Sequence, residues 1–243
     1  MRLTTAVLID AGFFLRRFPA VYRELDATDP KVVADTLFRM ATLHLLNRDG
    51  TRRHLHRILF YDCPPLAKKA HYPVSGRAVD FSRTPIALFR NALHDELRRK
   101  RKVALRLGHL LDEAAWTLRP ERLKKLLRRE LDFTSLTDED FSYEARQKGV
   151  DMRVGLDIAS LSYKKQVDQI VLVAGDSDFV PAAKLARREG IDFVLDPMWA
   201  TVHASLNEHI DGLRSTCPNP ARLRRGGPEP GGDGDVDPNV VAD

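Results

Sequence analysis

Aspartate residues follow two apolar segments of the chain at the point where each segment ends. Asp10 directly follows TAVLI, and Asp176 follows QIVLVA after a single glycine, with Asp178 two residues further on. Because the carboxyl ends of parallel strands form the ligand crevice of an α/β sheet, we expect these side chains to converge. Two more aspartates flank the start of the helix expected before QIVLVA and are placed to reach the same edge. The candidate carboxylates are Asp10, Asp151, Asp157, Asp176 and Asp178.

A cluster of carboxylates has a specific electrostatic requirement. The negative charges repel one another and raise each other's pKa unless a cation compensates them. An all-oxygen set without His or Cys suits Mg²⁺ or Mn²⁺ better than Zn²⁺. Each aspartate alone is equally explained as a turn or cap residue, and Asp178 is expected to cap the helix that contains Pro181 in its first turn. Their joint position at strand ends favours a metal site.

The elements that position these residues alternate along the chain. Short β-branched runs predict buried parallel strands, and segments with apolar side chains at helical spacing predict helices between them. This alternation predicts an α/β fold with a mostly parallel central sheet and helices on both faces. The expected strands are Thr5 to Ile9, Leu55 to Tyr61, Val103 to Leu107, Gln169 to Ala174 and Ile191 to Leu195, and the expected helices include Lys31 to Leu46, Pro85 to Lys100 and Phe179 to Glu189.

Two segments depart from this pattern. Residues 119–147 are highly charged, with one amphipathic helix from Arg119 to Leu131 followed by the turn-rich DFTSLTDED, and we interpret them as an insertion. Residues 216–243 are rich in Pro, Gly and Asp and poor in apolar side chains, so they are expected to form a disordered tail. The domain is therefore predicted to span residues 1–215.

Composition narrows the class of protein. The sequence has no apolar run long enough to span a membrane and no signal-peptide pattern, so a cytoplasmic protein without membrane contact is expected. Cys63 and Cys217 show no metal or disulfide spacing. The net charge of +5 is modest, but the run RRKRK concentrates positive charge. Its residues Arg98, Arg99, Lys100 and Arg101 are the candidate substrate-binding residues, the alternative being a solvated helix face.

The aspartate segments resemble a known family. KGVDMRVGLD, which continues into VDQIVLVAGDSDFVPAAKLARREG, is similar to the NYN domain of the PIN-like nuclease superfamily, in its bacterial LabA-like group. AVLIDAGFFL and YDCPP are also similar, and the resemblance covers about residues 4–213. It implies a three-layer α/β/α PIN-like fold. Many relatives carry Asn shortly after the first aspartate, where this chain has Phe13 and Phe14.

The resemblance also implies an activity and its residues. It implies an endonuclease acting on nucleic acid, with single-stranded RNA as the expected substrate, dependent on Mg²⁺ or Mn²⁺. Asp10, Asp157, Asp176 and Asp178 would be catalytic, Asp151 would join them as a metal ligand, and Ser177 would hydrogen-bond a ligand carboxylate. A non-catalytic RNA-binding module on the same fold is the first alternative. A haloacid dehalogenase-like phosphohydrolase is the second, although Asp10 lacks the second aspartate two residues later that such enzymes need. The sequence does not determine the oligomeric state, and a homo-oligomer is one of the possibilities.

Overall fold

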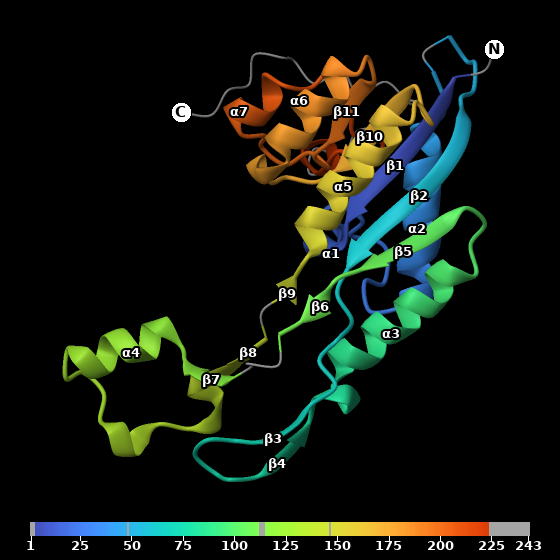
Figure 1. The fold of residues 1–243 in the computed structure, drawn as a ribbon. Helices are drawn as coiled ribbons and strands as arrows, with labels where there is room; N and C mark the ends of the chain where they lie inside the picture. The colour runs from blue at the N-terminus through green and yellow to red at the C-terminus, as the bar shows by residue number, and fades with distance from the viewer. Residues whose placement is uncertain (1–2, 48, 112–114, 146, 224–243) are drawn as a thin grey trace.

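A computed structural model describes residues 3–47, 49–111, 115–145 and 147–223. Its centre is a six-stranded sheet in the order β12-β11-β10-β1-β2-β5, in which every neighbouring pair is parallel. Figure 1 shows the strands running side by side, with their carboxyl ends toward the lower left. The α/β fold with a parallel sheet is confirmed. The strands are β1 (Thr4–Asp10), β2 (His54–Asp62), β5 (Val103–Leu107), β10 (Gln169–Val173), β11 (Asp192–Asp196) and β12 (Gly212–Leu213).

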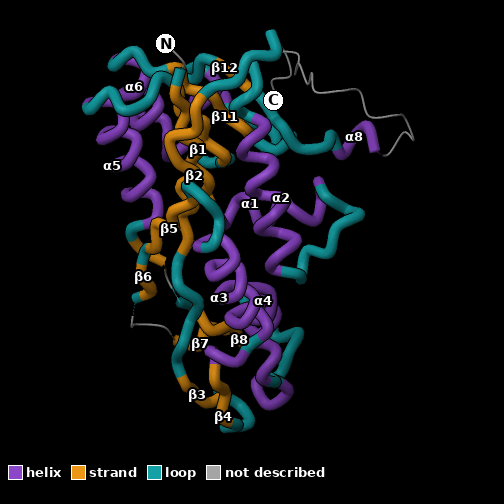
Figure 2. The backbone as a smooth tube through the Cα atoms, turned by 90° about the vertical axis from the view of Figure 1, so that its right-hand side faces the viewer, coloured by secondary structure: helices purple, strands orange, loops and turns teal. Residues whose placement is uncertain are grey.

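Helices cover both faces of this sheet (Figure 2). Alternate side chains of β1 point to opposite faces, so Val7 and Ile9 join one core cluster while Ala6 and Leu8 join the other. The first cluster contains α1 (Ala11–Val21), α2 (Pro30–Leu43) and α3 (Pro85–Arg98), and the second contains α5 (Val150–Tyr163) and α6 (Val180–Arg188). None of the helices in the described ranges is long and apolar enough to cross a membrane.

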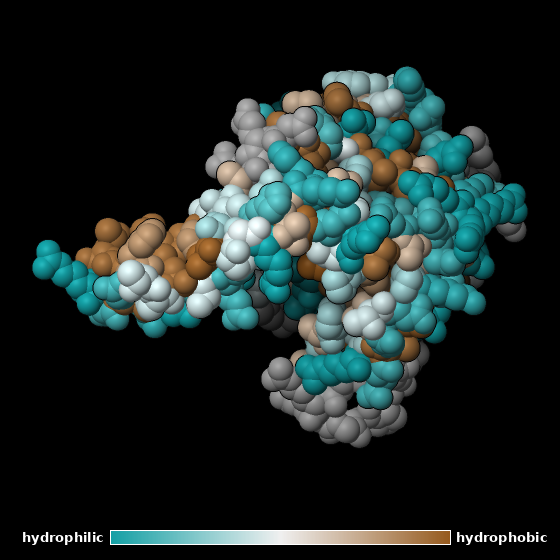
Figure 3. Space-filling model, turned by 90° about the horizontal axis from the view of Figure 1, so that it is seen from below, coloured by the Kyte–Doolittle hydropathy of each residue, from teal (hydrophilic) through white to brown (hydrophobic). Residues whose placement is uncertain are grey.

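A second structural unit projects from the carboxyl edge of the sheet as an arm (Figure 1). Two antiparallel ladders form its stem: β6 (His109–Leu110) with β9 (Gln147–Lys148), and β7 (Ala115–Leu118) with β8 (Phe141–Glu144). α4 (Pro120–Leu127) follows β7, and the short 3-10 helices η2 (Phe133–Ser135) and η3 (Asp138–Asp140) precede β8. Apolar side chains gather on the arm (Figure 3), and its exposed large ones are Leu123, Leu127 and Phe133.

The hairpin of β3 (Lys69–His71) and β4 (Ala78–Asp80) supports this arm. The Trp116 ring lies 5.0 Å from that of Tyr72 and 5.1 Å from that of Tyr143, centroid to centroid. The hairpin tip also donates two backbone N–H groups, those of Val74 and Ser75, to the Asp138 carboxylate at 3.1 Å. The charged segment expected from residue 119 is therefore part of a larger arm that begins at β6.

Several details differ from the sequence-based expectations. We expected only a turn after Asp10, but α1 starts there and contains Pro19. The expected cap role of Asp178 is wrong, because Asp176 accepts the Asp178 N–H and caps the 3-10 turn η4 (Ser177–Phe179) that leads into α6. Pro181 does lie in the first turn of α6, as expected.

The first residues assigned to the tail belong to the fold. Cys217 is only 5% exposed and joins the first core cluster, and its carbonyl accepts a hydrogen bond from Trp199 Nε1 at 2.8 Å. Thr216 Oγ1 donates to the Met40 carbonyl at 3.0 Å. A short helix, α8 (Pro220–Leu223), follows. The sequence shows little sign that these residues are folded, because one buried cysteine lies in a segment otherwise rich in Pro and Gly. The rest of the expected tail, residues 224–243, lies outside the described residues.

Candidate active site

Asp10 occupies the junction between the central strand and the first helix. It is the last residue of β1 and the N-cap of α1, where its Oδ1 accepts the N–H groups of Gly12 at 2.9 Å and Phe13 at 3.4 Å. Asp is favoured here because its oxygen satisfies helix N–H groups that have no intrahelical acceptor. Burial raises the pKa of Asp10 and the negative charge of Asp151 adds to this effect, although the two backbone hydrogen bonds oppose it. The second oxygen is left for other partners.

Asp151 lies in the first turn of α5, next to the left-handed Gly149 (φ 79°) at which that helix begins. Its side chain is exposed, yet its pKa is raised, first by partial burial and then by the negative charges of Asp176 and Asp178. The same residue raises the pKa of Asp10. Asp151 is therefore electrostatically coupled to three other aspartates, which come from two other segments of the chain: the end of β1 and the loop after β10.

The Asp176 loop is held against α1 by one aromatic contact. A Cβ atom added to Gly175 would lie 2.5 Å from Phe13 Cε2, so the absence of a side chain at Gly175 lets the Phe13 ring pack there. Phe13 is 6% exposed and belongs to the first core cluster. Asp176 and Asp178, on the other side of Gly175, are exposed at the carboxyl end of β10, the strand that pairs with β1. Phe13 thus positions one aspartate loop relative to the other.

Asp157 is not brought into this group. It lies on α5 facing β2 and β5, where its Oδ2 is 2.9 Å from Arg106 Nε and accepts a hydrogen bond from Tyr61 Oη, also at 2.9 Å. Burial, followed by the charge of Asp157, raises the pKa of Tyr61, so its hydroxyl remains a donor. The charge of Asp157 is therefore balanced within the protein, and its catalytic role stays a prediction.

The four remaining aspartates form a group, which we call the acidic cluster: Asp10, Asp151, Asp176 and Asp178. Within the described residues none of them forms an ion pair, whereas Asp62 and Asp196, the last residues of β2 and β11, and Asp157 on α5 each pair with an Arg or His. Uncompensated carboxylates at one edge have the charge and the oxygen chemistry that suit a divalent cation.

The side chains of the acidic cluster are not yet arranged as a complete set of metal ligands. In the described part of the chain, no three His, Cys, Asp or Glu side chains are already placed to hold a metal ion. Mg²⁺ does not require such a cage, because it keeps several waters and is bound by one or two carboxylates together with substrate phosphates. Asp10 and Asp176 are fixed by backbone hydrogen bonds, while the exposed side chains of Asp151 and Asp178 are free to turn toward an ion.

Ser177 and the RRKRK segment occupy positions different from those expected. No hydrogen bond of the Ser177 hydroxyl is found within the described residues, so its predicted bond to a carboxylate is not formed here. Arg98 pairs with Asp95 and Arg99 with Glu96, both at 2.6 Å, and Lys100 pairs with Asp35. These basic residues lie at the end of α3 and, with Arg101, in the turn before β5, at the amino edge of the sheet (Figure 1). Because Arg98, Arg99 and Lys100 already pair with acidic side chains, the structure adds no support to their predicted substrate contact, which stays a prediction.

A buried charge group at the end of β2 was missed. Asp62, 3% exposed, contacts Arg90 and is 2.8 Å from His94 Nε2. Burial alone would raise the pKa of Asp62, but the His94 hydrogen bond and the Arg90 guanidinium outweigh it and lower that pKa. The sequence contained the signal, because Asp62 follows an apolar strand as Asp10 does. The arrangement anchors α3 at the carboxyl edge.

A parallel α/β/α sheet with unpaired carboxylates at its strand ends is the arrangement expected for the PIN-like nuclease class that the sequence resembles. The model of one family, the NYN domain, matches residues 79–208, more than half of the chain, and the chain belongs to that family. The NYN domain lies within the PIN-like superfamily, so the expected family is confirmed, and the LabA-like group stays a prediction.

Other comparisons are more distant. No curated protein sequence matches the chain. Among solved structures, a Vibrio parahaemolyticus protein of unknown function is similar over 87% of this chain and 91% of its own, with 13% identity and a TM-score of 0.42. A chain from work on the structural basis for the mechanism and regulation of Sir2 enzymes covers 87% of this chain and 86% of its own, with 11% identity and a TM-score of 0.31.

Proposed function

We propose that this protein is a divalent-cation-dependent endonuclease that cleaves single-stranded RNA at the acidic cluster. The observation that carries the proposal is the uncompensated charge of Asp10, Asp151, Asp176 and Asp178 at the carboxyl edge of the sheet. Elsewhere at this edge the protein supplies its own cations to Asp62 and Asp157. Family membership supports nucleic acid as the substrate, and Mg²⁺ or Mn²⁺ is the cofactor that the oxygen ligands favour.

The four aspartates of the cluster differ in how firmly their side chains are held, and we assign them different roles accordingly. Asp10 and Asp176 each use Oδ1 to cap a helical turn, which fixes the direction of Oδ2. Asp151 and Asp178 are exposed, so their side chains can turn toward a bound cation. A cation bound there would lower the pKa of a water and neutralise charge on the leaving oxygen. The nucleophile would then be water, and within the described residues no Arg, Lys or His side chain pairs with the cluster in place of that cation.

A labelled single-stranded RNA incubated with Mn²⁺, and in parallel with EDTA, tests the activity. Asp176→Asn preserves the shape of the side chain, so the variant should fold but cleave far more slowly. Without metal it should melt at the wild-type temperature or higher, because one of several repelling charges is gone. Added Mn²⁺ should stabilise the wild type more than the variant, since binding to the folded state raises stability. Full activity in Asp176→Asn would remove this residue from the site.

An RNA-binding module without catalysis is the second candidate. The observation that favours it is that no three-ligand set is already formed within the described residues. This candidate predicts RNA binding that is the same in Mn²⁺ and in EDTA, with intact RNA recovered from both. The nuclease proposal predicts shortened products only in Mn²⁺.

A further inference from the structure

α6 links the acidic cluster to a groove at the opposite edge of the sheet. The helix begins two residues after Asp178 and ends at Arg188, next to the start of β11. Its nine residues span about 13 Å. The side chains of Ala183 and Ala186 are buried against the sheet, so the opposite face is available to solvent.

That solvent-facing side carries a regular stripe. Pro181, Lys184 and Arg188 are spaced three and four residues apart, which places them on one face of α6. Pro181, Lys184 and Arg188 are all exposed. The stripe starts three residues after Asp178 and continues with two cations, so it leads from the proposed cleavage site to positive charge.

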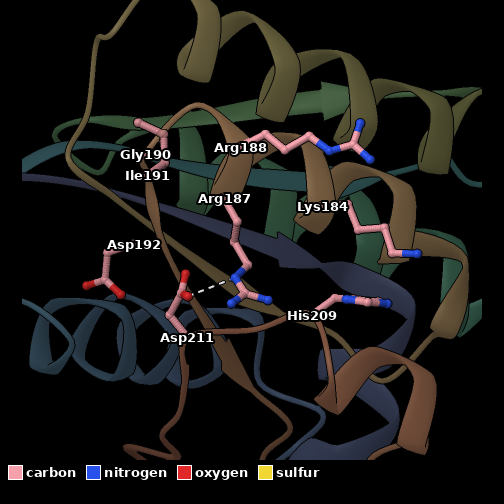
Figure 4. Close-up of a pocket in the computed structure, with 8 residues that line it drawn as sticks. All are labelled: Lys184, Arg187, Arg188, Gly190, Ile191, Asp192, His209 and Asp211. Carbon is pink, nitrogen blue, oxygen red and sulfur yellow. Dashed lines mark hydrogen bonds and ion pairs between the residues drawn. The ribbon is translucent and has the colours of Figure 1, made fainter.

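At its far end the stripe enters an open groove of about 670 Å³ (Figure 4). The two carboxylates of this groove already have partners. Asp211 accepts from Arg187 Nε at 2.8 Å and from the Phe193 N–H at 2.9 Å. Asp192 accepts from Gln169 at 2.7 Å. The groove is lined by Lys184, Arg187, Arg188, Gly190, Ile191, Asp192, His209 and Asp211.

The remaining basic side chains of the groove are not neutralised. Within the described residues, Lys184, Arg188 and His209 form no ion pair, whereas the neighbouring Glu189 pairs with Lys165 at 3.2 Å. Figure 4 shows these three side chains extending to the same side of the view, while Arg187 turns toward Asp211. The groove therefore presents the unpaired positive charges of Lys184 and Arg188, the chemistry that binds phosphate groups.

We infer that the α6 stripe and its groove bind the phosphodiester backbone of the RNA substrate, a few nucleotides away from the bond that is cleaved at the acidic cluster. This inference rests on the proposed function for the identity of the ligand. The residues that hold the backbone are Lys184 and Arg188, with His209 at the groove wall. A positively charged path that follows a sugar-phosphate backbone gives affinity without sequence preference.

The test measures binding in the Asp176→Asn background in EDTA, so that cleavage plays no part. The probe is a fluorescently labelled oligouridylate of about twelve nucleotides, within the usual site size of single-strand binders. Adding Lys184→Ala and Arg188→Ala should weaken binding on the order of tenfold at 0.1 M salt, because two phosphate contacts are lost. The slope of log affinity against log salt should become shallower by about 1.4.

The matched control replaces Arg98 and Arg99 with Ala, which removes the same charge from another exposed surface. This pair should leave affinity and salt slope nearly unchanged, and melting curves check that both double variants fold. Equal loss in the two double variants would show a general charge effect and would overturn the groove assignment, as would an unchanged salt slope in Lys184→Ala/Arg188→Ala. Failure of the wild type to cleave RNA in Mn²⁺ would reject the nuclease proposal alone, because the binding result does not depend on cleavage.

Discussion

The Phe13 ring packs directly against Gly175, leaving no room for a side chain at that glycine. This contact joins two loops that each carry an aspartate of the acidic cluster, since Phe13 is three residues after Asp10 and Gly175 directly precedes Asp176. Phe13 is buried, so this aromatic residue acts in packing and not by touching substrate. The spacing of the two aspartate loops therefore depends on the volume of this ring as well as on the pairing of β1 with β10.

Gly175→Ala should disturb both stability and cleavage. The added methyl group would overlap the buried ring, and overpacking of this kind costs about 1–3 kcal/mol of unfolding free energy. The loops should separate, so cleavage should fall more than the stability loss alone explains. Urea unfolding and a cleavage assay measure the two effects. Gly155→Ala is the matched control, because no atom lies within 4 Å of its Cβ position in α5, and the helix should gain about 0.5–1 kcal/mol. Wild-type behaviour of Gly175→Ala would show that the ring moves freely.

Asp151→Asn should stabilise the metal-free protein in a pH-dependent way. The pKa of Asp151 is raised in the folded state, so its ionisation opposes folding. Stability linked to this group is fully present below the unfolded pKa of 3.8 and is lost as pH rises through the folded pKa. The variant should therefore melt higher than wild type at neutral pH in EDTA, and the difference should vanish below about pH 3.8. A lower melting temperature at neutral pH would mean that the helix dipole outweighs the repulsion.

Asp62→Asn should show the opposite dependence on pH. The pKa of Asp62 is lowered, so its contribution to stability is present above the unfolded pKa of 3.8 and is lost as pH falls through the folded pKa. At neutral pH the variant leaves Arg90 and His94 without their carboxylate, and breaking a buried pair costs about 3 kcal/mol. Asp95→Asn removes an exposed pair with Arg98 and should cost less than about 1 kcal/mol. Equal losses in the two variants, measured by urea unfolding, would contradict the buried role of Asp62.

The core of the fold was predictable because its strands are short apolar runs and its helices keep a 3.6-residue spacing. The strand Val103 to Leu107 is confirmed residue for residue. α1 was not predicted, because Pro19 and the two phenylalanines after Gly12 obscure the helical spacing of its apolar residues. The N-cap role of Asp10 is recognised only from the backbone conformation. The two-residue strands β6 and β9 have no sequence signal at all, because their pairing depends on the arm folding back.

The candidate site also has a part that could be predicted from the sequence and a part that could not. A strand-end position brought Asp10, Asp176 and Asp178 to one edge, as expected, and Asp151 joins them through the start of α5. The pairing of Asp157 with Arg106 was not predictable, because it depends on β5 lying beside β2. The basic run at Arg98 has high charge density, but three of its residues pair with acidic neighbours, whereas Lys184 and Arg188 are separated in sequence and are brought onto one face only by α6.

Truncation at two points should show how much residues 216–223 contribute to folding. Removing everything after Ser215 deletes Cys217, which is 5% exposed in the core, together with the hydrogen bonds that Thr216 and Cys217 make to Met40 and Trp199. Each lost hydrogen bond costs about 1 kcal/mol and the emptied core position adds to this, so we expect a loss of about 3 kcal/mol. Removing only residues 224–243 should leave the unfolding midpoint unchanged. Cys217→Ala in the full-length chain should give a smaller loss than truncation after Ser215, because the backbone carbonyl that binds Trp199 remains. Identical urea midpoints for the two truncations would show that residues 216–223 contribute nothing to folding.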